Sequence, residues 1–347
     1  MSVISSGNKK QRKHLRLILA GLVIFMILVF LVSMTQGIYP LSLQEIFHIL
    51  GAGLGFDMEY THNGYVALMN VRLPRLTACI FVGAALSVSG ASYQGVFHNP
   101  MVSPDLLGAT SGAAFGACTS ILAAAPLLVQ QTSAFLFGMI AVALTLFISY
   151  SVSGKTNNTT TLVLTGMVVS SLFSAGVSIT KLLADTDNQL GEITFWLMGS
   201  MANLKLKSLP ILLIPVLISV VPLLLFSYRL NVVSFGDEEA VMMGVNVRRV
   251  RLATIICATL ATSASVAACG MVGWIGLVVP HLMRFIVGPD YRYLLPASAL
   301  GGAIFLMLVD NITRVFFTVE VSIGILTAII GAPFFLILLM KGRDSWL

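Results

Sequence analysis

Residues 17–44, LILAGLVIFMILVFLVSMTQGIYPLSLQ, contain no Asp, Glu, Lys or Arg. A helix needs about 20 mostly apolar residues to cross the hydrocarbon core of a bilayer, so this stretch is long enough for one span. It follows a basic segment at residues 9–16, as the core of a signal peptide does, but the apolar run is too long and no small-residue cleavage site ends it cleanly. We therefore interpret it as the first membrane span.

Uncharged stretches of similar length continue along the 347-residue chain, of which only 10% is charged, against about 25% in an ordinary soluble domain. They cover residues 76–104, 106–154, 156–180, 208–228, 252–283, 293–309 and 321–340. We expect 106–154 to divide near Pro126, and 252–283 to divide around Gly270 to Gly273. The sequence thus predicts an all-α polytopic membrane protein, one domain over residues 1–347 with about ten spans.

The net charge of +6 is interpreted as membrane topology rather than as a nucleic-acid surface. With the N-terminus inside and ten alternating spans, most Lys and Arg residues fall on the cytoplasmic side. An even number of spans also returns Lys341 and Arg343 to the cytoplasm. We therefore expect both termini to be cytoplasmic, with the longest outer loops at residues 36–72 and 184–207.

One predicted inner segment, residues 229–251, is densely charged. It contains Asp237, Glu238 and Glu239, followed by Arg248, Arg249 and Arg251. Ser234 and Asp237 have the spacing of a capping box, the acids favour a helix N-terminus, and Gly244 is a stop signal. We predict a short helix at the membrane surface, either a solvated loop helix or a docking surface for a cytoplasmic partner.

Small residues at helical spacing predict close contacts between spans, because helices in lipid associate where their backbones can approach. Two such stripes are Gly83, Ser87 and Ala91, and Gly108, Gly112 and Gly116.

Four ordered groups of residues resemble the permeases of ABC importers for iron-siderophore complexes, haem and vitamin B12. They are VRLPR (71–75) with Gly83–Leu86, Ser89–Gly90, Gln94, Asn99–Pro100, Pro104 and Leu107–Gly108; FGDEEA (235–240) with MGVNVR (243–248); GWIGLVVPH (273–281) with Arg284; and Asp310, Arg314, Glu320, Ile323–Gly324 and GAPF (331–334). The chain departs from the family pattern at Met101-Val102, Phe235 and Ser322, none of which is a charged position.

The resemblance implies a transporter in the cell (inner or plasma) membrane, with paired permease subunits of about ten helices each. Its other parts would be cytoplasmic ATP-binding subunits and an extracytoplasmic substrate-binding protein. The second permease would be an identical chain or a paralogue. Residues 229–251 match the segment that couples to the ATPase, and the coupling residues carried over are Gly236, Asp237, Glu238, Glu239, Met243, Gly244, Val245 and Arg248.

The resemblance also gives a role to three arginines. Arg72 and Arg75 open the second predicted span and Arg314 closes the ninth, so the topology places all three outside, against the positive-inside trend. They match positions that pair with glutamates of the binding protein. The alternative is that they are anchors at the membrane edge, with Arg314 paired to Asp310 one helical turn earlier.

Polar residues elsewhere have weaker interpretations. Thr159, Thr160 and Thr161 match the place where the family narrows its translocation path, so they are gate candidates. Gln94 either faces this path or makes a polar contact between helices. His281 has no second ligand at a suitable spacing, and we expect it to be structural rather than a metal ligand.

Two other classes of function compete with this prediction. An ion-coupled secondary transporter would need ionisable groups near the midplane, whereas the predicted spans contain almost none. A membrane enzyme would need paired carboxylates, a metal-ligand cluster or an activated nucleophile, and we identify no catalytic residue, metal site or cofactor motif. The chain also lacks a GxxxxGK[ST] phosphate loop, so ATP hydrolysis is expected from a separate subunit. A ferric siderophore is the expected cargo, with haem, vitamin B12 and molybdate as alternatives.

Overall fold

The computed structural model describes residues 2–53, 55–153, 159–317 and 321–342, and all regular structure within these ranges is helical. The ten long helices are α1 (Ser2–Thr35), α4 (Leu73–Val96), α5 (Ala109–Leu122), α6 (Leu127–Ser153), α7 (Thr159–Leu183), α9 (Leu209–Leu225), α12 (Val247–Cys269), α13 (Ile275–Val287), α14 (Tyr291–Phe316) and α15 (Ile323–Gly342). Each falls on one of the predicted stretches, and the all-α prediction is confirmed.

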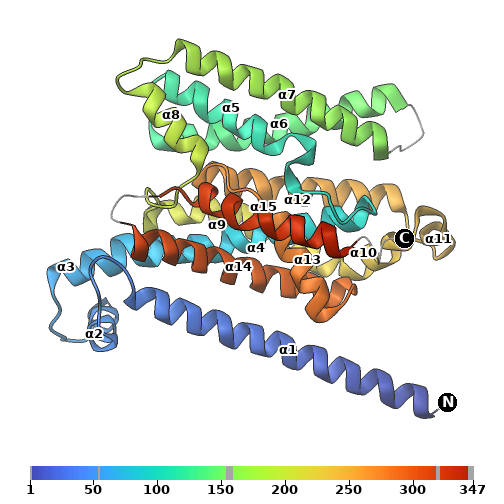
Figure 1. Ribbon diagram of the computed structural model, residues 1–347, viewed down its shortest axis with the longest axis horizontal. Helices are drawn as coiled ribbons and strands as arrows, with labels where there is room; N and C mark the ends of the chain where they lie inside the picture. Colours follow the sequence, from blue (N-terminus) through green and yellow to red (C-terminus); the bar gives the residue numbers. More distant parts are fainter. Residues whose placement is uncertain (1, 54, 154–158, 318–320, 343–347) are drawn as a thin grey trace.

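Not all of these helices reach the length of a full span. In the described ranges, seven apolar helical stretches are long enough to cross a membrane, whereas three others are shorter, at Ala109–Leu122, Ile275–Val287 and Ile323–Ile337. The total of ten spans therefore stays a prediction. Helix α1 begins and α15 ends on the side of the molecule where α11 (Asp237–Met242) lies (Figure 1).

The second long helix begins earlier than predicted. A short helix α3 (His62–Tyr65) continues through a π-helical segment (Val66–Arg72) into α4, so the expected loop at 36–72 is wrong in its last third. The expected boundary rested on the charge of Arg72, but this side chain is buried and satisfied by carbonyl groups. Two further helices, α2 (Leu43–Gly53) and α8 (Gln189–Met198), occupy the predicted outer loops.

Helices α5, α6, α7 and α8 form one layer, α4, α9 and α12 to α15 form the central layer, and α1 packs against α14 on the opposite side (Figure 1). Gly112 and Gly116 of α5 lie against α6, where an added Cβ would come within 2.5 Å of the carbonyl oxygens of Phe137 and Ser133. These two residues of the second predicted stripe therefore make the expected helix contact.

The first stripe joins α4 to α14 in the central layer. A Cβ on Gly83 would lie 2.2 Å from the carbonyl oxygen of Gly302, and a Cβ on Gly302 would lie 2.1 Å from that of Gly83. Any side chain at either position would push the helices apart. The predicted role of Gly83 is confirmed, since bare backbone meets bare backbone where the two helices cross.

We predict that Gly302→Ala destabilises the protein by about 1–3 kcal/mol, because the added methyl group overpacks the contact with Gly83. The measurement is thermal unfolding of the purified protein in detergent. Gly191→Ala is the matched control, since Gly191 of α8 has no atom within 4 Å of an added Cβ. Equal unfolding temperatures for the two variants would contradict the assigned contact.

Candidate functional site

The contact between Gly83 and Gly302 brings Arg75 and Asp310 together. Arg75 precedes Gly83 by eight residues and Asp310 follows Gly302 by eight, so each lies about 12 Å along its helix from the crossing point. Since α4 and α14 run in opposite directions, the two side chains arrive at the same level. Arg75 Nε donates to Asp310 Oδ1, and Asp310 is fully buried.

Arg314 completes this cluster. Its Nε donates to the second carboxylate oxygen of Asp310 at 2.8 Å, and its NH2 group donates to Asn311 Oδ1 at 2.6 Å. The pairing of Arg314 with Asp310 one turn earlier is confirmed. The NH2 group of Arg75 also donates to Thr313 Oγ1 at 3.1 Å. The single carboxylate of Asp310 thus pairs with two arginines, Arg75 and Arg314.

Arg72 lies beside them and donates to the carbonyl oxygens of Met34 and Tyr39. We call Arg72, Arg75 and Arg314 the arginine cluster. All three line a pocket of about 380 Å³ that also contains Tyr39. The pocket wall thus presents three guanidinium groups, two of which pair with Asp310. The cluster is largely buried and internally bonded, so a role in docking the binding protein stays a prediction.

We predict that Asp310→Asn destabilises the protein by about 3–5 kcal/mol, because it leaves two buried guanidinium groups without their shared carboxylate. Thermal unfolding in detergent is the measurement. Asp57→Asn removes an exposed acid from the loop that follows α2 and serves as the control. If both variants unfolded alike, Asp310 would not stabilise the cluster.

At the other end of the helix bundle, the predicted coupling segment forms two short helices instead of one, α10 (Ser227–Ser234) and α11. The predicted capping box is wrong, because Ser234 Oγ bonds to the carbonyl oxygen of Asn231 at 2.7 Å and Gly236 is the N-cap of α11. Gly236 has φ +137, in the range that favours glycine.

The predicted stop at Gly244 is correct. Its φ is +78, its N–H donates to the carbonyl oxygen of Val241, and the N–H of Val245 donates to that of Ala240. This pattern is a Schellman motif, which ends α11 sharply.

Two sets of side-chain contacts attach these short helices to long ones. Arg251 of α12, itself buried, donates to both oxygens of Asp237 at 2.9 and 3.0 Å. Asn231 of α10 donates to Asp290 at 2.6 Å and accepts from the N–H of Tyr291 at 2.7 Å, at the start of α14. The coupling segment is therefore fixed to both α12 and α14.

The exposed face of the coupling segment is largely apolar. Phe235, Val241, Met242 and Met243 are exposed, and Glu238 and Glu239 stand in the first turn of α11. Arg248 in the first turn of α12 lies over the ring of Tyr150, 5.5 Å from its centroid. The structure thus gathers the predicted coupling residues at one end of the bundle.

The residues predicted to line the translocation path are not brought together at one place in the structure. Gln94 is buried and accepts a hydrogen bond from Arg284 at 3.0 Å, which is the polar interhelical contact expected as an alternative. Thr159, Thr160 and Thr161 form the first turn of α7, while the neighbouring Asn157 and Asn158 lie outside the described residues. A gate at this place stays a prediction.

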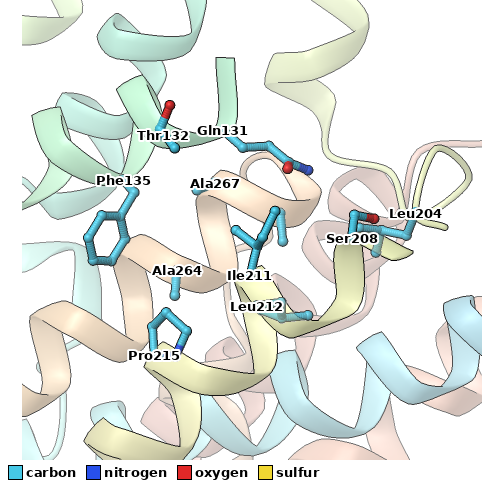
Figure 2. Close-up of a pocket in the computed structure, with 11 residues that line it drawn as sticks. Gln131, Thr132, Phe135, Leu204, Ser208, Ile211, Leu212, Pro215, Ala264 and Ala267 are labelled. Atoms are coloured by element: carbon cyan, nitrogen blue, oxygen red, sulfur yellow. The ribbon is translucent and has the colours of Figure 1, made fainter. Parts of the chain in front are cut away.

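A small pocket of about 90 Å³ lies between α6, α9 and α12. Figure 2 shows its lining, which includes the apolar side chains of Phe135, Ile211 and Pro215. Gln131 and Ser208 supply polar atoms, and no lining side chain is charged. Within the described part of the chain, no three His, Cys, Asp or Glu side chains lie close enough together to hold a metal ion. Neither finding indicates a reaction centre.

The sequence model of the FecCD transport family matches residues 22–341 of this chain. The chain belongs to the FecCD transport family. The molybdate import permease MolB of Haemophilus influenzae is 38% identical over 324 residues, 93% of this chain and 95% of that protein. The Fe(3+) dicitrate permease FecD of Escherichia coli is 37% identical over 318 residues, 90% and 95% of the two chains.

A solved structure of a metal-chelate type ABC transporter in an inward-facing conformation has a TM-score of 0.83 and 37% identity, covering 93% of this chain and 99% of that one. The family predicted from the sequence is confirmed. This FecCD permease is a multi-pass subunit of an ABC importer in the cell membrane, a transport component rather than an enzyme. The family implies ATPase, binding-protein and second-permease partners.

The contacts that attach the coupling segment were not predicted. Asp237 and Arg251 are 14 residues apart, and Asn231 and Asp290 are 59 residues apart, with no periodic pattern joining them. The one available signal was the place of Arg251 in the densely charged segment 229–251, which also contains Asp237.

We predict that Arg251→Gln in this FecCD permease lowers ATP-driven uptake by about 2- to 30-fold without reducing membrane insertion, because α11 loses its attachment to α12. The measurement is transport by the assembled complex in proteoliposomes, with the quantity of inserted permease measured in parallel. Arg249→Gln removes a neighbouring exposed charge and is the control. Equal uptake by the two variants would exclude a role for the ion pair in coupling.

Proposed function

We propose that this permease imports a metal chelate, most specifically a ferric siderophore, received from an extracytoplasmic binding protein. The relation to the ferric dicitrate permease FecD and the structural likeness to a metal-chelate type transporter support this cargo class. The observation that carries the transport role is the pair of short helices α10 and α11. Their solvent-exposed face is apolar, and their packed face is bonded to α12 and α14.

In the mechanism that we propose, the ATPase contacts Phe235, Met242 and Met243, and its closure moves α10 and α11. The contacts of Asn231 with Asp290 and Tyr291 pass this movement to α14, a helix of 26 residues and about 39 Å. Two permease subunits would then tilt about their interface and open the path alternately to the two sides.

The same helix carries Asp310 and Arg314 near its other end, beside Arg72 and Arg75. We propose that carboxylates of the loaded binding protein approach this arginine cluster. The three guanidinium groups of the cluster and the adjoining pocket of about 380 Å³ support the proposal. Because the arginines already have internal partners, docking would add to their contacts or rearrange them.

The charge pairing also favours ATP over an ion gradient as the energy source. Asp310 is a buried carboxylate within a span, and it is paired with two arginines. Both oxygens of this carboxylate accept hydrogen bonds from arginines, so it holds α4 and α14 together rather than standing open as a site for a coupling ion.

Molybdate is the second candidate cargo, because MolB is 38% identical to this chain over nearly its whole length. We predict ATP-dependent accumulation of a radiolabelled ferric siderophore in proteoliposomes containing the permease, its ATPase and its binding protein. Radiolabelled molybdate, haem and vitamin B12 are tested in parallel, and a non-hydrolysable ATP analogue is the control.

Uptake of molybdate without uptake of the ferric siderophore would overturn the proposed siderophore cargo and support molybdate instead. Accumulation driven by a proton gradient in the absence of ATP would overturn the ATP-driven mechanism.

A further inference from the structure

A pocket of about 640 Å³ lies beside α10, between the end of α4, α13 and the start of α14. We call it the α10 pocket. Gln94 and Arg284 lie in its lining, together with the exposed Tyr228 and the half-buried Asp290. Its lining combines residues of the coupling segment, such as Phe235, with Gln94 of α4 and Arg284 of α13, to which the proposed coupling assigns no role.

Gln94 supplies a hydrogen-bond donor that has no acceptor. Its Oε1 accepts from the NH2 group of Arg284 at 3.0 Å, which identifies the other amide atom as Nε2. Nε2 is buried and makes no hydrogen bond, and the residue as a whole is 3% exposed. A buried donor without an acceptor is destabilising, so a ligand that supplies an acceptor would be stabilised here.

Arg284 supplies a positive charge that is not neutralised. Its partners are the neutral side chains of Gln94 and Tyr291, and it has no carboxylate partner in the described part of the chain. A guanidinium group presents five donors in a planar fork, which suits an anion with several oxygen atoms.

The nearby acid does not satisfy Arg284. Asp290 pairs with Arg292 at 2.6 Å and accepts from Asn231 at 2.6 Å. Partial burial acts to raise the pKa of Asp290, but the hydrogen bonds from Arg292 and Asn231 outweigh it and hold the pKa below its usual value. Asp290 is therefore ionised and neutralised by Arg292, and the charge of Arg284 is left over.

We propose that the α10 pocket binds a phosphate-type oxyanion, held by Arg284 and the Nε2 group of Gln94. An anionic ligand would satisfy the free donor and the uncompensated charge together, through the charge-assisted hydrogen bonds that phosphate oxygens make. Two sources share this chemistry, inorganic phosphate and the headgroup of an anionic phospholipid. Tyr228, an exposed aromatic residue in the lining, is of the kind found at membrane interfaces, where basic pockets between helices bind lipid headgroups.

The test uses the full chain, purified and placed in nanodiscs of phosphatidylcholine alone or with phosphatidylglycerol. The thermal unfolding midpoint is measured while inorganic phosphate is titrated at constant ionic strength, with chloride as the reference anion. A rise with inorganic phosphate in phosphatidylcholine identifies the free anion as a ligand, and a rise with phosphatidylglycerol alone identifies the headgroup.

Arg284→Gln is expected to weaken the binding that gives this rise by about tenfold, because it removes the charged donor. Arg229→Gln is the matched control. Arg229 is an exposed arginine of α10 that lies over the ring of Phe226 and is not part of the pocket lining, so its loss should leave binding unchanged.

Gln94→Glu separates loss of binding from loss of folding. The new carboxylate would pair with Arg284, so the variant should unfold at the wild-type temperature or above in phosphatidylcholine. It should nevertheless lose the response to phosphate and to phosphatidylglycerol. The proposal would be overturned if neither ligand stabilised the wild-type protein, or if Gln94→Glu responded as the wild type does.

Discussion

The direct contact between the backbones of Gly83 and Gly302 determines most of the structure around it. In lipid, the hydrophobic effect does not drive helices together, so α4 and α14 depend on close approach and on the few polar groups that this approach aligns. The contact sets the level of every other residue on the two facing surfaces. Toward one end it aligns Arg75 with Asp310, and toward the other it aligns Gly95 with Tyr291, whose hydroxyl oxygen would lie 2.6 Å from an added Cβ.

The polar groups of this protein are concentrated at the two ends of that helix pair. At one end, Asp310 joins Arg75 and Arg314 in a largely buried set, which fixes the register of α14 against α4 because any sliding would leave a buried charge unpaired. At the other end, Asp290 and Tyr291 bind Asn231 of the coupling segment. One continuous helix thus connects the two regions at which the importer would meet its partners.

Much of the fold was predictable because lipid imposes a simple rule on composition. Stretches without charge located the ten long helices, the small-residue stripes located two helix contacts, and Gly244 located the end of α11. The start of the second long helix was missed because Arg72 was interpreted as a boundary. Arg72 is buried in the protein because it donates hydrogen bonds to the carbonyl groups of Met34 and Tyr39. These partners are more than 30 residues away, and a single sequence carries no signal of such distant contacts. The same reason explains why the partners of Arg251 and Asn231 were not foreseen.

The two ends of the molecule also differ in how they would respond to salt. A partner that contacts the arginine cluster would be held by attraction between charges, which weakens as ionic strength rises; the screening length is about 10 Å at about 0.1 M salt. The exposed face of the coupling segment is built from Phe235, Val241, Met242 and Met243, whose burial against a partner depends on apolar area. If the binding protein docks at the arginine cluster as we propose, dilute surroundings would speed that encounter and leave the apolar contact with the ATPase unchanged.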